Sequence, residues 1–188
     1  MTFVSVSGSA AQGVLRHATW RVVRIRRFSP EDAPAFRELR LRALRDAPHA
    51  FASSLAQEEP CPLAEWEERV RRAAAGPDEV GFFAVEGEAP VGMVGAYLDA
   101  REGEPDVAHL VAMWVAPEMR GRGVGSALTR AVLGWAGERG ARLVKLWVTT
   151  TNLDAVRLYE RCGFGHTGRV EPLPSDPKLS IERLERVP

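Results

Sequence analysis

Apolar and polar residues alternate along residues 20–27 as they do in a strand, and this pattern begins the part of the chain that we expect to fold. Residues 29–32 read Ser-Pro-Glu-Asp, a sequence typical of a helix start, and apolar residues then recur at helical spacing to about residue 45. After a loop, a second helix is predicted to follow Pro62 and to run to about residue 75, where Gly76-Pro77 ends it. The beginning of the chain therefore predicts the order strand, helix, helix.

The rest of the chain predicts further strands separated by two helices. Two apolar runs flank the turn-forming residues 86–90, which is the pattern of a hairpin. A glycine at position 140 ends the first of the two helices. The strands are predicted over 80–85, 91–98, 108–115, 142–149, 164–168 and 179–184, and the helices over 124–139 and 152–159.

The predicted order β-α-α-β-β-β-α-β-α-β-β is that of a mixed α/β fold. Pro172, Pro174 and Pro177 lie between the last two strands. Because proline donates no backbone hydrogen bond, we expect this segment to be extended and outside the sheet. Such a segment forms either one wall of a cleft or a plain connector.

Composition restricts the class of protein. The chain has 188 residues, 45% hydrophobic and 27% charged, so we expect a single domain over residues 20–188. Residues 1–19 lack the basic start and compact apolar core of a signal peptide, and we expect a flexible extension there. Basic and acidic residues balance at 25 each, which argues against nucleic acid or an anionic membrane as a partner.

The sequence also argues against a membrane span and a metal site. No stretch approaches the roughly 18 consecutive apolar residues that a spanning helix needs. Cys61 and Cys162 are too few for a disulfide framework or a zinc site, and the histidines lack metal-ligand spacing. We therefore expect reduced thiols, no metal and a cytoplasmic location.

A glycine- and arginine-rich loop follows the predicted strand 108–115 and leads into a helix. Glycine lets the backbone approach a ligand closely, and the free amides at a helix start favour an anion. Two arginines add forked donors suited to phosphate oxygens. The loop residues are Arg120, Gly121, Arg122, Gly123 and Gly125. Together they predict a site for a pyrophosphate.

Two common phosphate motifs do not match. A nucleoside-triphosphate loop needs Gly-Lys-Ser/Thr, and no lysine is present here. A dinucleotide fingerprint needs glycine or alanine where Ser126 stands, and an acid about 20 residues further on, where the sequence reads Arg-Leu-Val-Lys. The spacing Arg120-x-x-Gly123-x-Gly125 instead resembles the R/Q-x-x-G-x-G/A motif of the GCN5-related N-acetyltransferases (GNAT), whose ligand is the pyrophosphate of acetyl-CoA.

A second segment strengthens this resemblance, which covers roughly residues 20–187. After the strand 142–149, the sequence contains Asn152, Ala155, Leu158, Tyr159 and Gly163-Phe164. A similar strand, asparagine, helix, tyrosine and Gly-Phe follow the phosphate loop in that family. The resemblance implies a GNAT-like fold, with a twisted and mostly antiparallel sheet of six to seven strands and about four flanking helices.

The resemblance also implies roles for individual residues. The backbone of residues 113–115 should pair with the pantetheine amides as an added strand would, and Asn152 should bind the same arm. Tyr159 should lie near the cofactor sulfur and act as the acid that protonates the thiolate; the alternatives are a packing role for this ring and a helix cap for Asn152. The implied cofactor-binding residues are Met113, Trp114, Val115, Arg120, Gly121, Arg122, Gly123, Val124, Gly125, Ser126, Asn152, Ala155 and Tyr159.

Acetyl transfer to an amine needs a base, and His109 is the candidate. It lies eleven residues before Arg120, where histone-acetylating members of the family carry a glutamate. An imidazole has an ordinary pKa near 6.5 and suits the role. Two alternatives stay open: His109 lies at the surface or behind the residues that contact the substrate, or a water chain is the base. On the acceptor side, the resemblance points to the loop 47–59, with Phe51, Ser53, Ser54 and Glu58 as substrate-binding candidates.

These observations predict an acetyl-CoA-dependent N-acetyltransferase that works by direct transfer. The acceptor would be a small amine, an amino acid or antibiotic, or a peptide or protein amine. The alternative is a non-catalytic sensor or regulatory module that binds acyl-CoA. Sequence leaves open whether the chain forms a homodimer.

Overall fold

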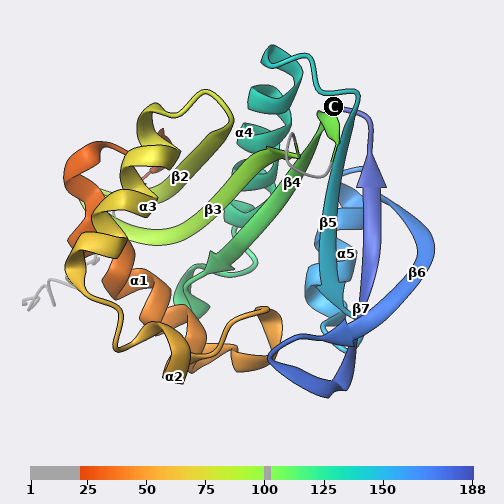
Figure 1. Cartoon of the computed structure of the whole chain (residues 1–188), viewed down its shortest axis with the longest axis horizontal. Coiled ribbons are helices and arrows are strands. Elements are labelled where there is room, and N and C mark those ends of the chain that lie inside the picture. Colours follow the sequence, from red (N-terminus) through yellow and green to blue (C-terminus); the bar gives the residue numbers. More distant parts are fainter. Residues whose placement is uncertain (1–21, 100–102) are drawn as a thin grey trace, which may run out of the picture.

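The computed structural model describes residues 22–99 and 103–188, which form a twisted sheet with helices packed on both faces (Figure 1). Within these residues the sheet has seven strands in the order β1-β2-β3-β4-β5-β7-β6, and all neighbours are antiparallel except β4 and β5. The strands are β1 Val23–Arg27, β2 Glu79–Glu86, β3 Ala89–Asp99, β4 Glu104–Val115, β5 Leu143–Thr149, β6 Gly165–Leu173 and β7 Asp176–Arg186.

The helices match the predicted order, with one addition. The α-helices are α1 Ala33–Asp46, α2 Leu55–Glu58, α3 Leu63–Ala75, α4 Val124–Glu138 and α5 Leu153–Arg161, and 3-10 turns lie at Pro30–Asp32, Pro48–Ala50 and Pro117–Met119. The addition is α2, inside the predicted loop 47–59. It is four residues long, too short for a hydrophobic period, and Ser54 and Gln57 form its capping box.

Apolar side chains on both faces of the sheet form the core. On one face, the Phe83 ring lies 4.3 Å from Phe28, and Phe36 of α1 lies 5.6 Å from Trp66 of α3. On the other face, α4 packs so closely that a Cβ at Gly92 would come within 3.3 Å of Leu128. Helices α1 and α3 therefore cover one face of the first four strands, and α4 covers the opposite face.

The last two strands are longer than predicted, which corrects the expectation for the proline segment. Pro172 lies inside β6, opposite Ser180, and Pro177 lies inside β7. The edge position of β6 explains Pro172, because an edge strand has one side that needs no backbone N–H for a ladder. Pro177 is the second residue of β7 and precedes Ile181, the first residue of β7 that pairs with β5. The turn between the two strands is tied to the loop after α1, since the Ser175 hydroxyl donates to the Phe51 carbonyl at 2.6 Å.

Strands β4 and β5 pair only over a short length and then diverge (Figure 1). Their ladder runs from Val107 opposite Leu143 to His109 opposite Lys145. Beyond it, the pairing of β4 with β3 shifts at a bulge, where Ala112 has a left-handed φ of 54°. Residues 110–115 therefore keep a ladder with β3 on one edge, and the edge that faces β5 carries none.

Two sequence expectations are only partly covered by the described residues. The predicted strand 20–27 appears as β1, which begins at Val23, and the flexible extension over 1–19 lies outside the described residues. Within the described ranges, no helix is both long and apolar enough to cross a membrane.

Candidate active site

The loop before α4 owes its shape to two glycines in left-handed conformations. Gly121 has φ 72° and Gly123 has φ 79°, and a Cβ at either position would meet no atom within 4 Å. The backbone conformation therefore requires glycine here, since space is available. Gly123 is the N-cap of α4, and no side chain caps this helix. The amides of its first turn are thus free of intrahelical partners and favour an anion.

Gly125 has a different reason to be glycine. A Cβ at this position would lie 2.9 Å from Leu158 Cδ2 of α5. The residue therefore lets α4 and α5 pack closely, and this packing fixes α5 relative to the loop. The sequence interpretation, in which all three glycines let a ligand approach, covers only part of their role.

Both arginines of the loop contact acidic residues. The Arg120 guanidinium pairs with the Asp46 carboxylate, and its Nε donates to the Val115 carbonyl at 3.0 Å. Trp114 Nε1 donates to the same Asp46 carboxylate at 2.9 Å. Burial raises the pKa of Asp46, but the hydrogen bonds from Trp114 and Arg120 outweigh it and hold the pKa below its usual value. Asp46 thus ties the end of α1 to the end of β4.

Arg122 lies on the other side of the loop. Its Nη2 is 3.3 Å from Glu86 Oε1 at the end of β2, and its Nη1 is 3.0 Å from Met119 Sδ. A phosphate bound at this loop would compete with Asp46 for Arg120 and with Glu86 for Arg122. The backbone amides would therefore be its principal hydrogen-bond donors.

The free edge of β4 lies beside this loop. It includes Met113, Trp114 and Val115, and the Val115 carbonyl accepts from Arg120. A left-handed conformation of a residue with a side chain, as at Ala112, costs on the order of 1 kcal/mol and is characteristic of functional sites. The bulge turns the edge of β4 away from β5 and leaves its backbone groups accessible to an extended ligand.

Helix α5 carries Asn152 and Tyr159. Asn152 is the N-cap, and its Oδ1 accepts from the Ala155 amide at 3.2 Å, so the capping role holds. Tyr159 is buried, and its ring packs edge-on against Phe164 at 5.8 Å. Burial raises the Tyr159 pKa far above its ordinary value, with a smaller contribution from Cys162. Its hydroxyl makes no hydrogen bond to another described residue and is protonated at neutral pH.

His109 is held by two partners that the sequence reasoning did not identify. Its Nε2 lies 2.8 Å from Asp99 Oδ2, and its ring stacks on Tyr97 with centroids 5.0 Å apart and planes 4° apart. The side chains are 14% and 4% exposed for His109 and Asp99, so most of the His109 ring is covered, and its role as the base stays a prediction. With Nε2 protonated toward the carboxylate, Nδ1 is the basic nitrogen of the neutral ring.

Three of the four candidates on the acceptor side, Phe51, Ser53 and Glu58, belong to a largely buried charged cluster. Glu58 pairs with Arg40 at 2.9 Å and with Arg69 at 3.3 Å, and it accepts a hydrogen bond from Ser53. Burial raises the Glu58 pKa, but the hydrogen bond and charge of Arg40 prevail and lower it. Arg40 also lies 4.3 Å from the Phe51 ring. These contacts fix the loop after α1, and Ser54 caps α2.

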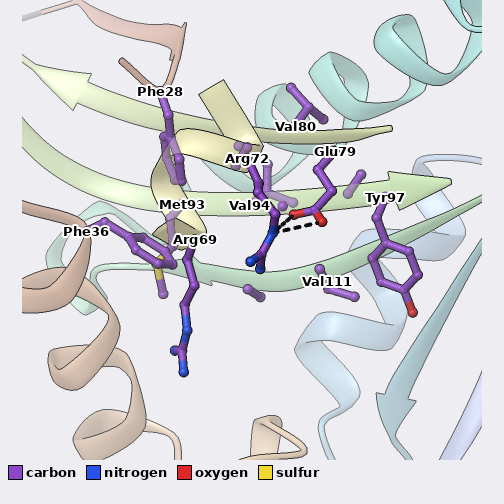
Figure 2. Close-up of a pocket in the computed structure, with 15 residues that line it drawn as sticks. Phe28, Phe36, Arg69, Arg72, Glu79, Val80, Met93, Val94, Tyr97 and Val111 are labelled. Atoms are coloured by element: carbon purple, nitrogen blue, oxygen red, sulfur yellow. Dashed lines mark hydrogen bonds and ion pairs between the residues drawn. The ribbon is translucent and has the colours of Figure 1, made fainter. Parts of the chain in front are cut away.

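A cavity of about 170 Å³ lies on the face of the sheet that α1 and α3 cover (Figure 2). Phe28 and Phe36 close one end of it, and Tyr97 and Val111 lie at the other. None of the four acceptor-side candidates lines the cavity. Its remaining lining residues are Arg69, Arg72, Ala73, Glu79, Val80, Gly81, Met93, Val94, Gly95, Ala96 and Ala112.

Comparison with known proteins agrees with this arrangement. Residues 33–164 match the acetyltransferase (GNAT) family. The chain is 34% identical over 147 residues to an aminoglycoside N(6')-acetyltransferase type 1 from Stenotrophomonas maltophilia, covering 78% of this chain and 88% of that protein. It is 33% identical over 150 residues to a mycothiol acetyltransferase from Thermobispora bispora, covering 76% of this chain and 46% of that protein.

The chain thus spans less than half of the mycothiol acetyltransferase. It also covers 40% of an uncharacterized N-acetyltransferase from Methanocaldococcus jannaschii, which is 39% identical over 94 residues, 46% of this chain. Among solved structures, a GNAT acetyltransferase from Streptococcus pneumoniae has a TM-score of 0.78 at 20% identity, covering 88% of this chain and 99% of that one. A PaiA N-acetyltransferase from Thermoplasma acidophilum, in complex with coenzyme A, has a TM-score of 0.69 at 17% identity, covering 89% and 99%. These likenesses show a shared fold.

Proposed function

Because the chain belongs to the acetyltransferase (GNAT) family, we propose that it moves the acetyl group of acetyl-CoA directly to a primary amine. One observation carries the proposal: the uncapped start of α4, with Gly123 at φ 79°, lies beside a strand whose edge is free. An anion site next to an open strand edge suits a ligand with a pyrophosphate at one end and amides along an arm.

The residues present fit such a ligand. The first-turn amides of α4 would hold the pyrophosphate, and the backbone of residues 113–115 would pair with the pantetheine amides. The Asn152 side chain, whose oxygen caps α5, has an amide nitrogen left to contact the same arm. The thioester supplies a carbonyl carbon that an amine can attack and a thiolate that can leave.

His109 is the proposed base for the acceptor amine. An alkylamine has an ordinary pKa of about 10.4 and is mostly protonated at neutral pH, so it must lose a proton before or during attack. The neutral His109 ring would take this proton on Nδ1, while the Asp99 carboxylate holds the ring in place and stabilises the resulting imidazolium. Transfer forms one carbon–nitrogen bond and breaks one carbon–sulfur bond.

Tyr159 has a narrower role than a simple acid. Its pKa is raised by burial, whereas a thiol has a pKa of about 8.5, so complete proton transfer from the phenol to the thiolate is unfavourable. We propose that the neutral hydroxyl donates a hydrogen bond to the developing thiolate and stabilises it as it leaves. The proton that the thiolate finally takes then comes from solvent, which receives the one lost by His109.

Calorimetric titration with acetyl-CoA, followed by thiol release with a panel of amines, tests the proposal. The panel should include small amines, amino acids, peptides and an aminoglycoside, because a related protein is named for that last acceptor. Binding with amine-dependent release is expected. Binding without release from any amine would favour the acyl-CoA sensor, and failure to bind acetyl-CoA would overturn the assignment of the glycine loop.

A further inference from the structure

We propose that the acceptor carries its amine on an apolar group about the size of one aromatic ring, and that this group occupies the cavity on the α1 and α3 face of the sheet. The inference rests on the proposed function, and it names the class of amine that the site selects. Three observations support it: the size of the cavity, the chemistry of its walls, and the Tyr97 ring, which lines the cavity and stacks on His109.

The size of the cavity sets the size of the group. Its volume is about 170 Å³, close to the roughly 150 Å³ of an apolar cavity that is known to hold one benzene molecule. Two glycines on adjacent strands, Gly81 and Gly95, line the cavity, and a Cβ at Gly95 would already reach Val111 at 3.4 Å. A single six-membered ring therefore fills the space, and a tri-saccharide does not.

The walls are apolar, and their charged groups are already paired. Phe28, Phe36 and Val111 supply rings and methyl groups to the lining. Arg72 Nε lies 3.2 Å from Glu79 Oε1, a pair joined by dashed lines in Figure 2, and Arg69 pairs with Glu58.

The cavity places an amine beside the proposed chemistry. Tyr97 lines the cavity and its ring stacks on His109, so one residue joins the cavity to the proposed base, which does not itself line the cavity. Ala112, at the bulge that opens the edge of β4, also lines it. A ring seated between Phe36 and Tyr97 would therefore carry its amine toward both the base and the free strand edge. Partial burial also lowers the pKa of an amine, which increases the share of the neutral nucleophile.

The test has two parts: it compares kcat/KM for three amines, and it repeats the comparison in a variant whose cavity is filled by a larger side chain. We expect kcat/KM for 2-phenylethylamine to exceed that for ethanolamine and for kanamycin by on the order of ten- to a hundredfold, the range expected for burial of one ring. Val111→Phe places a ring in the cavity from a partly exposed strand position and should reduce this preference at least tenfold with acetyl-CoA affinity retained. Gly134→Ala is the matched control, because that helix position faces open space away from the cavity.

A binding measurement separates this inference from the proposed function. Saturation-transfer NMR with 2-phenylethanol, which has the same ring and cannot be acetylated at nitrogen, reports occupancy of the cavity without any turnover. Binding that Val111→Phe abolishes and Gly134→Ala retains would support the inference even if no amine released thiol. Equal turnover of all three amines, or failure of 2-phenylethanol to bind, would overturn it. Gly95→Ala, whose new methyl makes only ordinary contacts, repeats the test if Val111→Phe does not fold.

Discussion

The Asp99 carboxylate lies 2.8 Å from His109 Nε2, and the two residues come from neighbouring strands, β3 and β4. Asp99 is 3% exposed, and a carboxylate so deeply buried is costly unless it has a partner. The pair resembles the arrangement in which a carboxylate fixes the tautomer of a catalytic histidine. It gives the proposed base a defined orientation before any substrate binds.

The pair should act as one unit in catalysis. We expect His109→Ala and Asp99→Asn each to lower kcat by roughly ten- to a thousandfold, since general base catalysis contributes on the order of 10² to 10⁴. In the His109→Ala background, Asp99→Asn should have little further effect on kcat, because its partner is already gone. Steady-state kinetics of the two single variants and the double variant check this. Fully multiplicative losses would separate Asp99 from the action of His109.

Tyr159→Phe should separate catalysis from packing. The variant keeps the ring and loses a hydroxyl that has no hydrogen-bond partner among the described residues, so the melting temperature should stay the same or rise slightly. We expect kcat to fall on the order of tenfold or more with unchanged affinity for acetyl-CoA. The raised pKa of Tyr159 also predicts that its hydroxyl stays protonated up to pH 10, so its ionisation removes no activity over that range. A kcat equal to that of the parent would leave this residue a packing role alone.

Charge at the start of α4 can be tested with a matched pair of substitutions. Gly123→Asn and Gly123→Asp have side chains of nearly the same shape, and both tolerate a left-handed φ better than other residues with a side chain. Only aspartate would repel a pyrophosphate. Calorimetry should therefore give Gly123→Asp an affinity for acetyl-CoA on the order of tenfold below that of Gly123→Asn, and the difference should shrink at high salt. Equal affinities would place the pyrophosphate elsewhere.

Glu58 should be important for stability at neutral pH. Its pKa is lowered in the folded chain, so its contribution is present above the ordinary glutamate pKa of about 4.3 and is lost as the pH falls through the lower folded value. Glu58→Gln leaves the buried Arg40 without a charged partner and should reduce the free energy of unfolding by about 3 kcal/mol at pH 7. Glu59→Gln, in an exposed pair with Arg45, is the control and should cost less than about 1 kcal/mol.

Urea unfolding at pH 7 and pH 3 measures the loss of unfolding free energy in Glu58→Gln and its dependence on pH. The difference between the parent and Glu58→Gln should narrow at the lower pH, because the parent glutamate is then losing its charge. A difference that is the same at both pH values would show that shape, and not charge, makes Glu58 stabilising.

Local pattern was sufficient for the order of the elements and for the glycine loop. Periodicity placed the hairpin β2–β3 and helix α4, and Arg120-x-x-Gly123-x-Gly125 located a loop whose conformation needs glycine at two positions. These features depend on residues close together in the sequence. The short helix α2 and the full length of β6 escaped prediction because a capping box and an edge position, rather than a hydrophobic period, determine them.

The partners of the candidate site residues could not be predicted in the same way. Asp99 and Tyr97 reach His109 only through the register of β3 on β4, which shifts between Leu98 and Asp99 and again at the Ala112 bulge, and the sequence marks neither shift on β4 with a glycine. Arg40 is one of four arginines in α1, a composition typical of an exposed helix face, yet its side chain is buried against Glu58 and Phe51. In each case the decisive contact joins separate elements and depends on how they pack.

The short ladder between β4 and β5 has a mechanical consequence. Among the described residues, only three residue pairs join β4 to β5. They connect one half of the sheet, strands β1, β2, β3 and β4, to the other half, strands β5, β7 and β6, so few backbone hydrogen bonds hold the two halves together. A ligand that pairs with the free edge of β4 and also contacts β5 would add to this short connection and act as a temporary strand between the two halves. Loading with acetyl-CoA would then make the halves unfold together, and hydrogen exchange in β5 and β7 would slow when the cofactor is bound and quicken after it leaves. In each catalytic cycle, the sheet would open less often while the cofactor is bound and more often after it leaves.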